Sequence, residues 1–440
     1  MFDALFTTTT EYKKLSHALS GKGACALFGL PASGRAQVYA ALCRQLDKPL
    51  CIVTPGEAEA TRFAADLNTL GIPAAVFPAR DYVLRPIEGT AREYEYRRLA
   101  VLGELVGGRL RAVAVPAEAL TQFTTPKEDF CANTRTLHAG DTLLRDDLLA
   151  ALFGAGYTRR AQVDGPGQFS VRGDIVDIFA PDQKMPVRME FWGDEIDTLH
   201  TFDLTTQRRE DAIDKFYLSP AREVLFGKPA DAAEQLRAFL AKQRGKKKTA
   251  MADCMAADLD LLDGGAVPVN MDKYLAVRYP HPATVLDYFD DPILVAEEPA
   301  SIREADRATA YRRGEELKSL ILDGVLCAGL DNLYADPSYL WSKTGHYRTI
   351  CAENFARSMP DQPLKDIINA PAHTLPAWNG EVAGLLEDLK PLCDAGYTVT
   401  LLAGTDRAAA GLARDLRDKG ILVTTCLLYT SPSPRDRTRS

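Results

Sequence analysis

Residues 28–37, FGLPASGRAQ, decide the fold of the first part of the chain. The stretch follows an apolar run and precedes a helical pattern, and its glycines, Gly29 and Gly34, have the spacing of the phosphate-binding motif G-x-x-x-x-G-K-[ST]. Arg35 stands where this motif requires Lys, and Ala36 stands where it requires Ser or Thr. The sequence therefore predicts the strand, loop and helix of a P-loop fold in which two chemical groups are replaced.

The two replaced groups are the ones that handle a nucleotide. The P-loop Lys neutralises phosphate oxygens as a compact charge and the hydroxyl binds Mg²⁺, whereas a guanidinium is a wide planar fork and alanine offers no ligand. Glu297 and Glu298 end a later apolar strand, where an ATPase holds its Mg²⁺-binding and catalytic carboxylates. We interpret the loop and this acidic pair as relics of a nucleotide site, with no cofactor, no metal and no catalytic residue. Residual nucleotide binding is the alternative.

Short apolar strands alternate with helical patterns along residues 1–126. Buried strands joined by helices are typical of a parallel sheet that is covered on both faces. We therefore predict that residues 1–126 form the first part of a degenerate RecA-like (P-loop NTPase-like) α/β domain. The expected strands are residues 24–29, 49–55, 73–78 and 111–116, and the expected helices are residues 36–46, 57–70 and 91–106.

The pattern changes after residue 126. A helix is expected at residues 144–154, and the runs TRRAQV, GQFSVRG, DIVDIF, VRMEFW and EIDTLHTF then alternate with period two between turn residues. These patterns predict an inserted antiparallel α+β module over residues 127–218.

The RecA-like pattern returns after the module. Residues 219–341 are expected to be the second part of the domain, with a strand at 292–299 and a long helix at 302–320. Residues 342–425 are expected to form a small C-terminal α/β domain. Its expected elements are helices at residues 380–395 and 407–419 and a strand at residues 398–404.

The last fifteen residues, 426–440, do not show the strand and helix patterns of the rest of the sequence. Their sequence, CLLYTSPSPRDRTRS, looks like the translation of a transposon-type sequencing adapter. The other interpretation is a disordered tail rich in Ser, Pro and Arg.

Composition restricts the compartment and the partners. The 440 residues carry a formal net charge of −8, so no overall positive field attracts nucleic acid. The nine cysteines include no C-x-x-C pair, which argues for a reducing compartment and against a structural zinc. The start of the chain lacks the layout of a signal peptide, and no apolar run is long enough to cross a membrane. We therefore expect a cytoplasmic location without membrane contact.

One stretch carries a family resemblance. GQFSVRGDIVDIFAP (residues 167–181), followed by PVRMEFWGDEIDTLHTFDLTTQRR (residues 186–209), resembles the second domain of bacterial transcription-repair coupling factor, and a similar module occurs in the excision-repair protein UvrB. The resemblance is dense over residues 144–209 and weaker but continuous over residues 1–425. UvrB keeps an intact P-loop and a tyrosine-rich hairpin, which this sequence lacks. The N-terminal, UvrB-homology region of the coupling factor is therefore the better match.

The resemblance implies a recruiting role. In the family this module binds UvrA, the damage-recognition ATPase, at lesions where RNA polymerase has stalled. RNA polymerase and double-stranded DNA are bound by later domains, which include an ATP-driven translocase and which these 440 residues do not contain. The resemblance therefore implies that this part of the protein is not itself an enzyme.

Four residues of the module are the candidate partner-binding site. Period two places Arg172 on one face of the expected sheet, with Arg159 and Arg160 on the strand before it and Phe179 nearby. By residue type alone, the arginines are ordinary solvated charges and Phe179 is a core residue. Arg159 and Arg172 match positions where UvrB also carries Arg, while Arg160 has no such match. The resemblance thus implies that Arg159, Arg160, Arg172 and Phe179 contact UvrA.

Two other functions remain open from the sequence. A divergent UvrB-like DNA-repair ATPase would hydrolyse ATP despite Arg35 and Ala36. A DNA-binding module would use the basic run KQRGKKK, Lys242–Lys248, together with the arginines of the module's sheet, and its affinity would fall steeply with salt. We interpret this run as a solvated loop, and the acidic net charge disfavours DNA binding.

Overall fold

The computed structural model describes residues 7–87, 92–357, 359, 362–372, 382–397, 399–401 and 405–425. The chain divides into two compact units, Met1–Pro371 and Ala372–Ser440, and each is described by itself. None of the helices in the described ranges is both long and apolar enough to cross a membrane.

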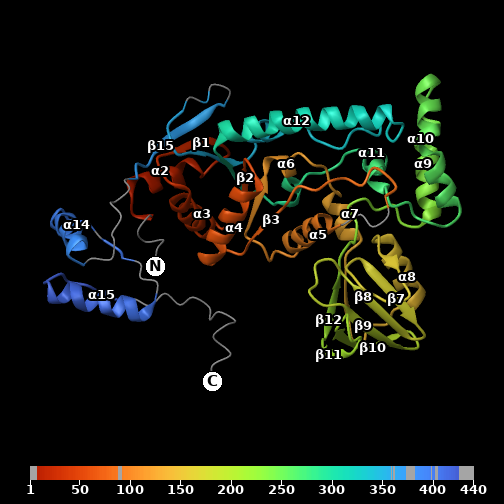
Figure 1. The fold of residues 1–440 in the computed structure, drawn as a ribbon, viewed down its shortest axis with the longest axis horizontal. Coiled ribbons are helices and arrows are strands. Elements are labelled where there is room, and N and C mark those ends of the chain that lie inside the picture. The colour runs from red at the N-terminus through yellow and green to blue at the C-terminus, as the bar shows by residue number, and fades with distance from the viewer. Residues whose placement is uncertain are drawn as a thin grey trace. The chain divides into compact units, whose positions relative to one another are not determined.

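The first unit is built on a seven-stranded sheet in which every neighbouring pair of strands is parallel (Figure 1). Its strand order is β15-β1-β14-β13-β2-β4-β3. The strands are β1 (Gly23–Phe28), β2 (Leu50–Thr54), β3 (Ala74–Val76), β4 (Ala112–Pro116), β13 (Ile293–Glu297), β14 (Arg348–Glu353) and β15 (Leu364–Asn369). The predicted parallel α/β fold is confirmed, and the strand expected at residues 292–299 is part of this sheet.

Helices cover both faces of the parallel sheet. The helices on one face are α2 (Thr10–Ala18), α3 (Ala32–Leu46) and α4 (Glu57–Thr69). The helices on the other face are α5 (Glu93–Val106), α6 (Ala117–Leu120) and the first turns of α12 (Pro299–Leu322). Successive strand residues alternate between the two cores, so that Cys25 and Leu27 face α3 while Ala26 and Phe28 face the other way. Burial on both faces explains the continuous apolar runs in the sequence.

A separate six-stranded sheet forms the inserted module. Its order is β11-β10-β9-β8-β7-β6, and all neighbours are antiparallel except β6 and β7, which are parallel. The predicted antiparallel module is confirmed, and its edge strand β6, which follows helix α8 (Arg145–Gly154), is the exception because no hairpin joins it to β7. The strands are β6 (Thr158–Arg159), β7 (Gln168–Arg172), β8 (Ile175–Phe179), β9 (Val187–Trp192), β10 (Glu195–Phe202) and β11 (Arg209–Ala212).

Local sequence explains the hairpins of this sheet. The β7–β8 and β9–β10 loops are two residues long, and each begins with a glycine in the left-handed region, Gly173 (φ 61°) and Gly193 (φ 62°). Glycine at the first position is what type II′ turns require. Helix α8 covers one face of the sheet, where its residues Leu148 and Leu152 share one apolar core with Phe169.

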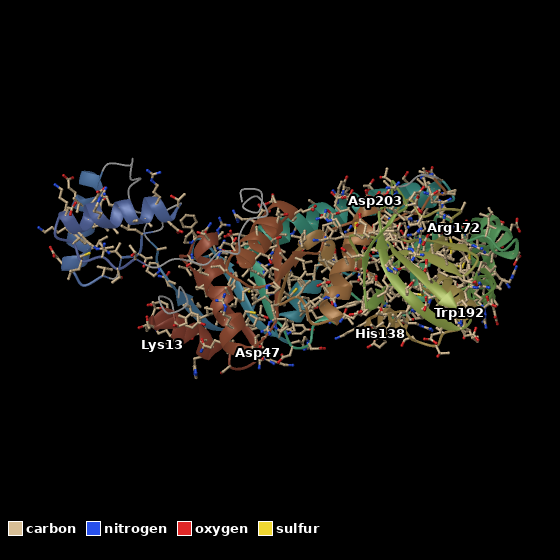
Figure 2. All side chains as sticks on the ribbon, turned by 90° about the horizontal axis from the view of Figure 1, so that it is seen from below. Lys13, Asp47, His138, Arg172, Trp192 and Asp203 are labelled. Carbon is tan, nitrogen blue, oxygen red and sulfur yellow. The ribbon has the colours of Figure 1, made fainter. Side chains whose placement is uncertain are left out.

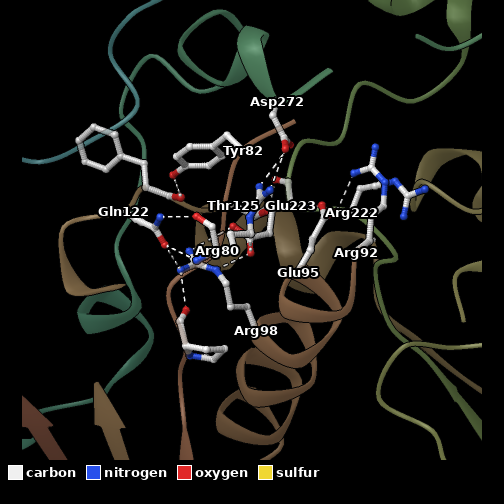
Figure 3. A network of polar contacts seen from close by, with 12 residues as sticks. Arg80, Tyr82, Arg92, Glu95, Arg98, Gln122, Thr125, Arg222, Glu223 and Asp272 are labelled. Carbon is white, nitrogen blue, oxygen red and sulfur yellow. Dashed lines mark hydrogen bonds and ion pairs between the residues drawn. The ribbon is translucent and has the colours of Figure 1, made fainter. Parts of the chain in front are cut away.

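Two features attach the module to the parallel domain. Strand β5 (Arg135–His138) pairs with β12 (Lys215–Leu218), so the two ends of the insertion lie side by side. Just beyond β12, Glu223 is fully buried and receives Arg98 Nε at 2.6 Å and Arg80 Nε at 3.3 Å (Figure 3). Arg80 also pairs with Asp272 at 2.7 Å. This buried ionic network joins α5, the module's C-terminal end and η1 (Met271–Tyr274).

A helical lobe completes the first unit. Its elements are α9 (Pro229–Ala241), α10 (Gly245–Asp263), η1, α11 (Leu275–Arg278) and the C-terminal part of α12, which share one apolar core. The remaining short elements are α7 (Lys127–Ala132), η2 (Val285–Tyr288) and α13 (Tyr339–Lys343). Lys242–Lys248 was expected to be a loop, and this is wrong for its second half, because α10 begins at Gly245 and contains three of the lysines in its first turn.

The structure moves one domain boundary. Residues 342–425 were expected to form a separate domain, but β14 and β15 lie within that range and pair with β1 of the parallel sheet. The second unit contains α14 (Val382–Asp394) and α15 (Asp406–Asp418). Of the strand expected at residues 398–404, the described residues 399–401 are not in a strand and the others lie outside the described residues, as does the tail 426–440.

Candidate functional site

The loop at Gly29–Ala36 does not form a phosphate cradle. Helix α3 begins at Ala32, so Gly34 lies inside its first turn, and the Arg35 backbone N–H donates to Pro31 O at 3.0 Å. A P-loop needs such N–H groups free to bind phosphate. Gly29 keeps a positive φ of 91°, and a Cβ there would come within 2.8 Å of Ala370 O. The loop is therefore closed against the segment that follows β15.

The Arg35 side chain forms ion pairs with the two predicted relic carboxylates. Its guanidinium lies 3.0 Å from Glu297 Oε2 and 2.9 Å from Glu298 Oε1, and Arg35 is only 2% exposed. The Tyr39 hydroxyl, one helical turn further along α3, donates a hydrogen bond to Glu297. The structure thus brings together the predicted relic residues, but it pairs them with one another.

The protonation of this cluster follows from its burial. Burial raises the pKa of Glu297 to about 7, although Arg35 and the hydrogen bond from Tyr39 both oppose that rise. For Arg35, burial disfavours the charged form, but Glu297, Tyr39 and Glu298 together raise the pKa above its usual value. In the described ranges no group of His, Cys, Asp and Glu side chains is arranged to hold a metal ion. The cluster can stabilise the fold, and its groups are already engaged with one another.

The six-stranded sheet of the module has two unlike faces. Phe169, Val176 and Met189 point into the core beneath α8. Arg172 and Asp177 lie on the opposite side, which we call the outward face. The outward face is the surface on which the sequence placed the arginine site.

Arg172 and Arg188 share one carboxylate on the outward face. Arg172 Nη2 lies 2.6 Å from Asp177 Oδ2, and Arg188 Nε lies 2.7 Å from Asp177 Oδ1. Asp177 is completely buried, whereas 48% of the Arg172 side chain is exposed. Two guanidinium groups and one carboxylate leave one positive charge. Arg172 is therefore held in place and still presents N–H donors to solvent.

Phe179 is not exposed on this face, contrary to the expectation that it contacts a partner. It is 6% exposed and packs with Val163 and Phe202 in a small second core, which Leu204 borders. The segments around Val163 and Leu204 cover this end of β8, and Gln207 Nε2 donates to Leu204 O at 2.8 Å. The register puts Phe179 opposite Gln168, on the outward side of β8, but sequence alone did not show that loops cover it.

Arg159 and Arg160 lie at the β6 edge and are both exposed. In the parallel β6–β7 register Arg159 is opposite Phe169, so by alternation it belongs to the α8 side of the sheet. Arg160 follows β6, and its backbone N–H donates to Phe169 O at 2.8 Å. The structure therefore does not bring Arg159 and Arg172 together on one face.

Trp192 was missed by the sequence interpretation. It ends β9 beside the Gly193 turn, and 82% of its surface is exposed. It shares the side of the sheet with Arg188, two alternations away, and Figure 2 labels it and Arg172 on the module. The sequence could have indicated this exposure, because Trp192 ends an expected strand directly before the turn residues Gly193 and Asp194. Exposed Trp and Arg side chains are enriched among residues that dominate protein interfaces.

Comparison with known proteins gives this module a name. Residues 136–224 match the family model of the UvrB interaction domain. The chain therefore combines a parallel sheet, consistent with a RecA-like core, with an inserted module that matches the UvrB interaction domain.

Relatives extend the match over most of the chain. The transcription-repair-coupling factor of Bacillus subtilis (strain 168) is 25% identical over 406 residues, which are 90% of this chain and 34% of that protein. The protein of the same name from Myxococcus xanthus is 35% identical over 208 residues, 45% of this chain and 17% of its own length. That of Mycobacterium bovis is 34% identical over 257 residues, 56% of this chain and 20% of its own length. These matches show that the chain is similar to transcription-repair-coupling factors over most of its length, and they support an N-terminal region of such a protein. The chain spans about a third or less of these relatives.

Proposed function

We propose that this chain recruits UvrA to lesions where RNA polymerase has stalled, and that the outward face of the module makes the contact. The observation that carries the proposal is Arg172, which is half exposed and yet fixed by the buried Asp177. A side chain that is already ordered loses little freedom on binding, so more of its interaction energy appears as affinity. The match of residues 136–224 to the UvrB interaction domain supports this partner.

The remaining parts of the proposal follow the family. Arg160 at the β6 edge stays a proposed contact, Arg159 is proposed to contribute little because it lies on the α8 side, and Trp192 joins the proposed surface. RNA polymerase and double-stranded DNA are proposed to be bound by other domains of the full-length protein, in the cytoplasm. This region is proposed to be non-catalytic, because Arg35 already occupies Glu297 and Glu298.

Calorimetric titration of the 440-residue chain with UvrA tests the proposal. Arg172→Ala is expected to weaken binding by about 2 kcal/mol, roughly thirtyfold. Arg135→Ala is the matched control, because Arg135 is an exposed arginine on β5, outside the six-stranded sheet. Absence of UvrA binding by the folded chain, or an equal loss in both variants, would contradict the proposal.

An ATPase assay with and without DNA separates this function from a divergent UvrB-like ATPase. The proposal expects no turnover above that of a Glu297→Gln variant. Turnover that Glu297→Gln abolishes would favour the enzyme, because a carboxylate at this position would then act on the nucleotide.

A further inference from the structure

The turn between α9 and α10 carries five cations that the structure leaves without acidic partners. They are Lys242, Arg244, Lys246, Lys247 and Lys248, and all five are exposed. Within the described residues none of them lies within ion-pair distance of a carboxylate, although Arg237 on α9 pairs with Asp263 on α10. We call residues 242–248 the basic turn. Its charge stands out in a chain of net charge −8.

The position of three of these lysines is electrostatically unfavourable in the free protein. Lys246, Lys247 and Lys248 lie in the first turn of α10, where no acidic residue is present and no side chain caps the helix. The first N–H groups of a helix are unpaired and carry a partial positive charge, so cations there are destabilising. Helices α4 and α8 show the usual arrangement, with Glu or Asp in the first turn. An anion bound at the basic turn would remove this repulsion.

The composition of the basic turn restricts the anion. Besides its cations it has only Gln243 and Gly245, and Thr249 and Ala250 follow, so no aromatic or large apolar side chain is present. Single-stranded nucleic acid is usually held by stacking on aromatic rings, and a membrane surface is held by an apolar helix face. Neither means is available here. Closely spaced phosphates of a duplex need only cations and polar groups.

The place of the basic turn in the fold makes it accessible. Helices α9 and α10 pack side by side at one end of the helical lobe, and the basic turn is their connection (Figure 1). Gly245 has a φ of 58°, and a Cβ there would meet nothing within 4 Å. The backbone at the start of α10 is therefore open to a ligand.

We propose that the basic turn is a binding site for the phosphate backbone of double-stranded DNA, without sequence preference. The proposal is independent of UvrA binding, because the basic turn and the outward face belong to different elements. It reverses the interpretation of Lys242–Lys248 as a solvated loop, on the ground of the helix start at Gly245.

Fluorescence anisotropy with a labelled duplex of about 20 base pairs tests the proposal over a series of salt concentrations. Each phosphate contact contributes about 0.9 to the slope of log affinity against log salt, so five cations that each contact one phosphate predict a slope of about −4.5. Lys246→Ala/Lys247→Ala/Lys248→Ala should reduce the magnitude of that slope by about 2.7 and weaken low-salt binding at least about tenfold. The control, Lys13→Ala/Lys14→Ala/Lys22→Ala, removes the same charge from exposed sites elsewhere.

The outcomes distinguish the proposal from its rivals. An unchanged slope in the control and a reduced slope in the α10 variant support it. Equal losses in both variants would show a general effect of charge, and no binding to duplex at low salt would exclude the site. Tighter binding of a single strand or of duplex RNA than of duplex DNA would also overturn the assignment. The α10 variant should unfold at the same or a higher temperature than the parent chain, because it removes repulsion at a helix start.

Discussion

Two arginines of this chain pair with buried carboxylates, but only one of them is exposed to solvent and so able to contact a partner. Arg35, at the end of the parallel sheet, is 2% exposed and faces both Glu297 and Glu298. Arg172, on the module, shares the single carboxylate of Asp177 with Arg188, and 48% of its side chain is exposed. At the parallel sheet two carboxylates form ion pairs with one guanidinium group. At the module one carboxylate leaves a guanidinium partly unsatisfied.

The comparison shows what separates a structural arginine from one that can bind a partner. The residue types at the two sites are similar, because each site pairs an arginine with a buried carboxylate. The ratio of carboxylates to guanidinium groups and the exposure decide the outcome. A buried and neutralised pair contributes to the fold, whereas an ordered, exposed and net positive group keeps donors for a partner.

The largest expected effect concerns the most deeply buried charges, in the network that joins the module to the parallel domain. Arg98→Leu leaves Glu223 buried with only Arg80 as a cationic partner, at 3.3 Å. Removing one partner of a buried pair destabilises strongly, so we expect a loss of about 4 kcal/mol in the free energy of unfolding, measured in urea. Arg85→Leu is the control, because the Arg85–Asp323 pair is roughly half exposed and should contribute less than about 1 kcal/mol. Similar losses in both variants would remove burial as the deciding factor.

The sequence predicted those parts of the fold that repeat a simple pattern. The strands β1 to β4 and β13 read as apolar runs, and β6 to β10 read as period-two runs, so these strands were placed close to their observed positions. Strand β14 was not predicted, although it is buried. Strand β15 was not predicted, because its side chains at Lys365, Asp366 and Ile367 are exposed and its sequence shows no apolar run. It joins the sheet through its backbone register with β1.

The candidate site was predictable only in part. Alternation gave the side of the sheet on which Arg172 lies, since that depends on the strand alone. It could not give the loops that bury Phe179, the parallel register that turns Arg159 away, or the partners of Arg35 from a strand about 260 residues further along. These depend on contacts between distant segments, which a single sequence does not display.

The acidic cluster at Arg35 should make stability depend on pH. Burial raises the pKa of Glu297 to about 7 from an ordinary value of 4.5. A raised pKa in the folded protein means that the fold binds this proton more tightly than the unfolded chain, so its contribution is present at low pH and is lost as pH rises through about 7. Glu297→Gln removes the titration. In urea unfolding at about pH 5 and pH 8, we expect the parent chain to lose about 2 kcal/mol relative to this variant. A difference that does not change with pH would mean that Arg35 keeps Glu297 ionised throughout.

Trp192 provides a second test of the outward face of the module. An exposed tryptophan on the same side of the sheet as the ordered arginines should become buried in a complex. Truncation to alanine should cost about 1.5 kcal/mol, roughly a tenfold loss of UvrA affinity by calorimetry. Tyr311→Ala is the matched control, since Tyr311 on α12 is 74% exposed and lies outside the module. Neither variant should change the unfolding temperature. Unchanged UvrA affinity in Trp192→Ala would restrict the contact to the arginines.

The smallest expected effect concerns Arg159, which tests whether the face of the sheet decides binding. The register places Arg159 opposite Phe169, on the α8 side, so a partner seated on the outward face should not reach it directly. We therefore expect Arg159→Ala to weaken UvrA binding by about 0.5 kcal/mol or less, against about 2 kcal/mol for Arg172→Ala. The double variant should lose the sum of the two, because residues on opposite faces without shared partners act independently. A loss for Arg159→Ala as large as that for Arg172→Ala would show that the partner wraps around the β6 edge and contacts both faces. The exposed arginines would then matter wherever they lie on the module, and the shared carboxylate of Asp177 would no longer distinguish Arg172 from Arg159.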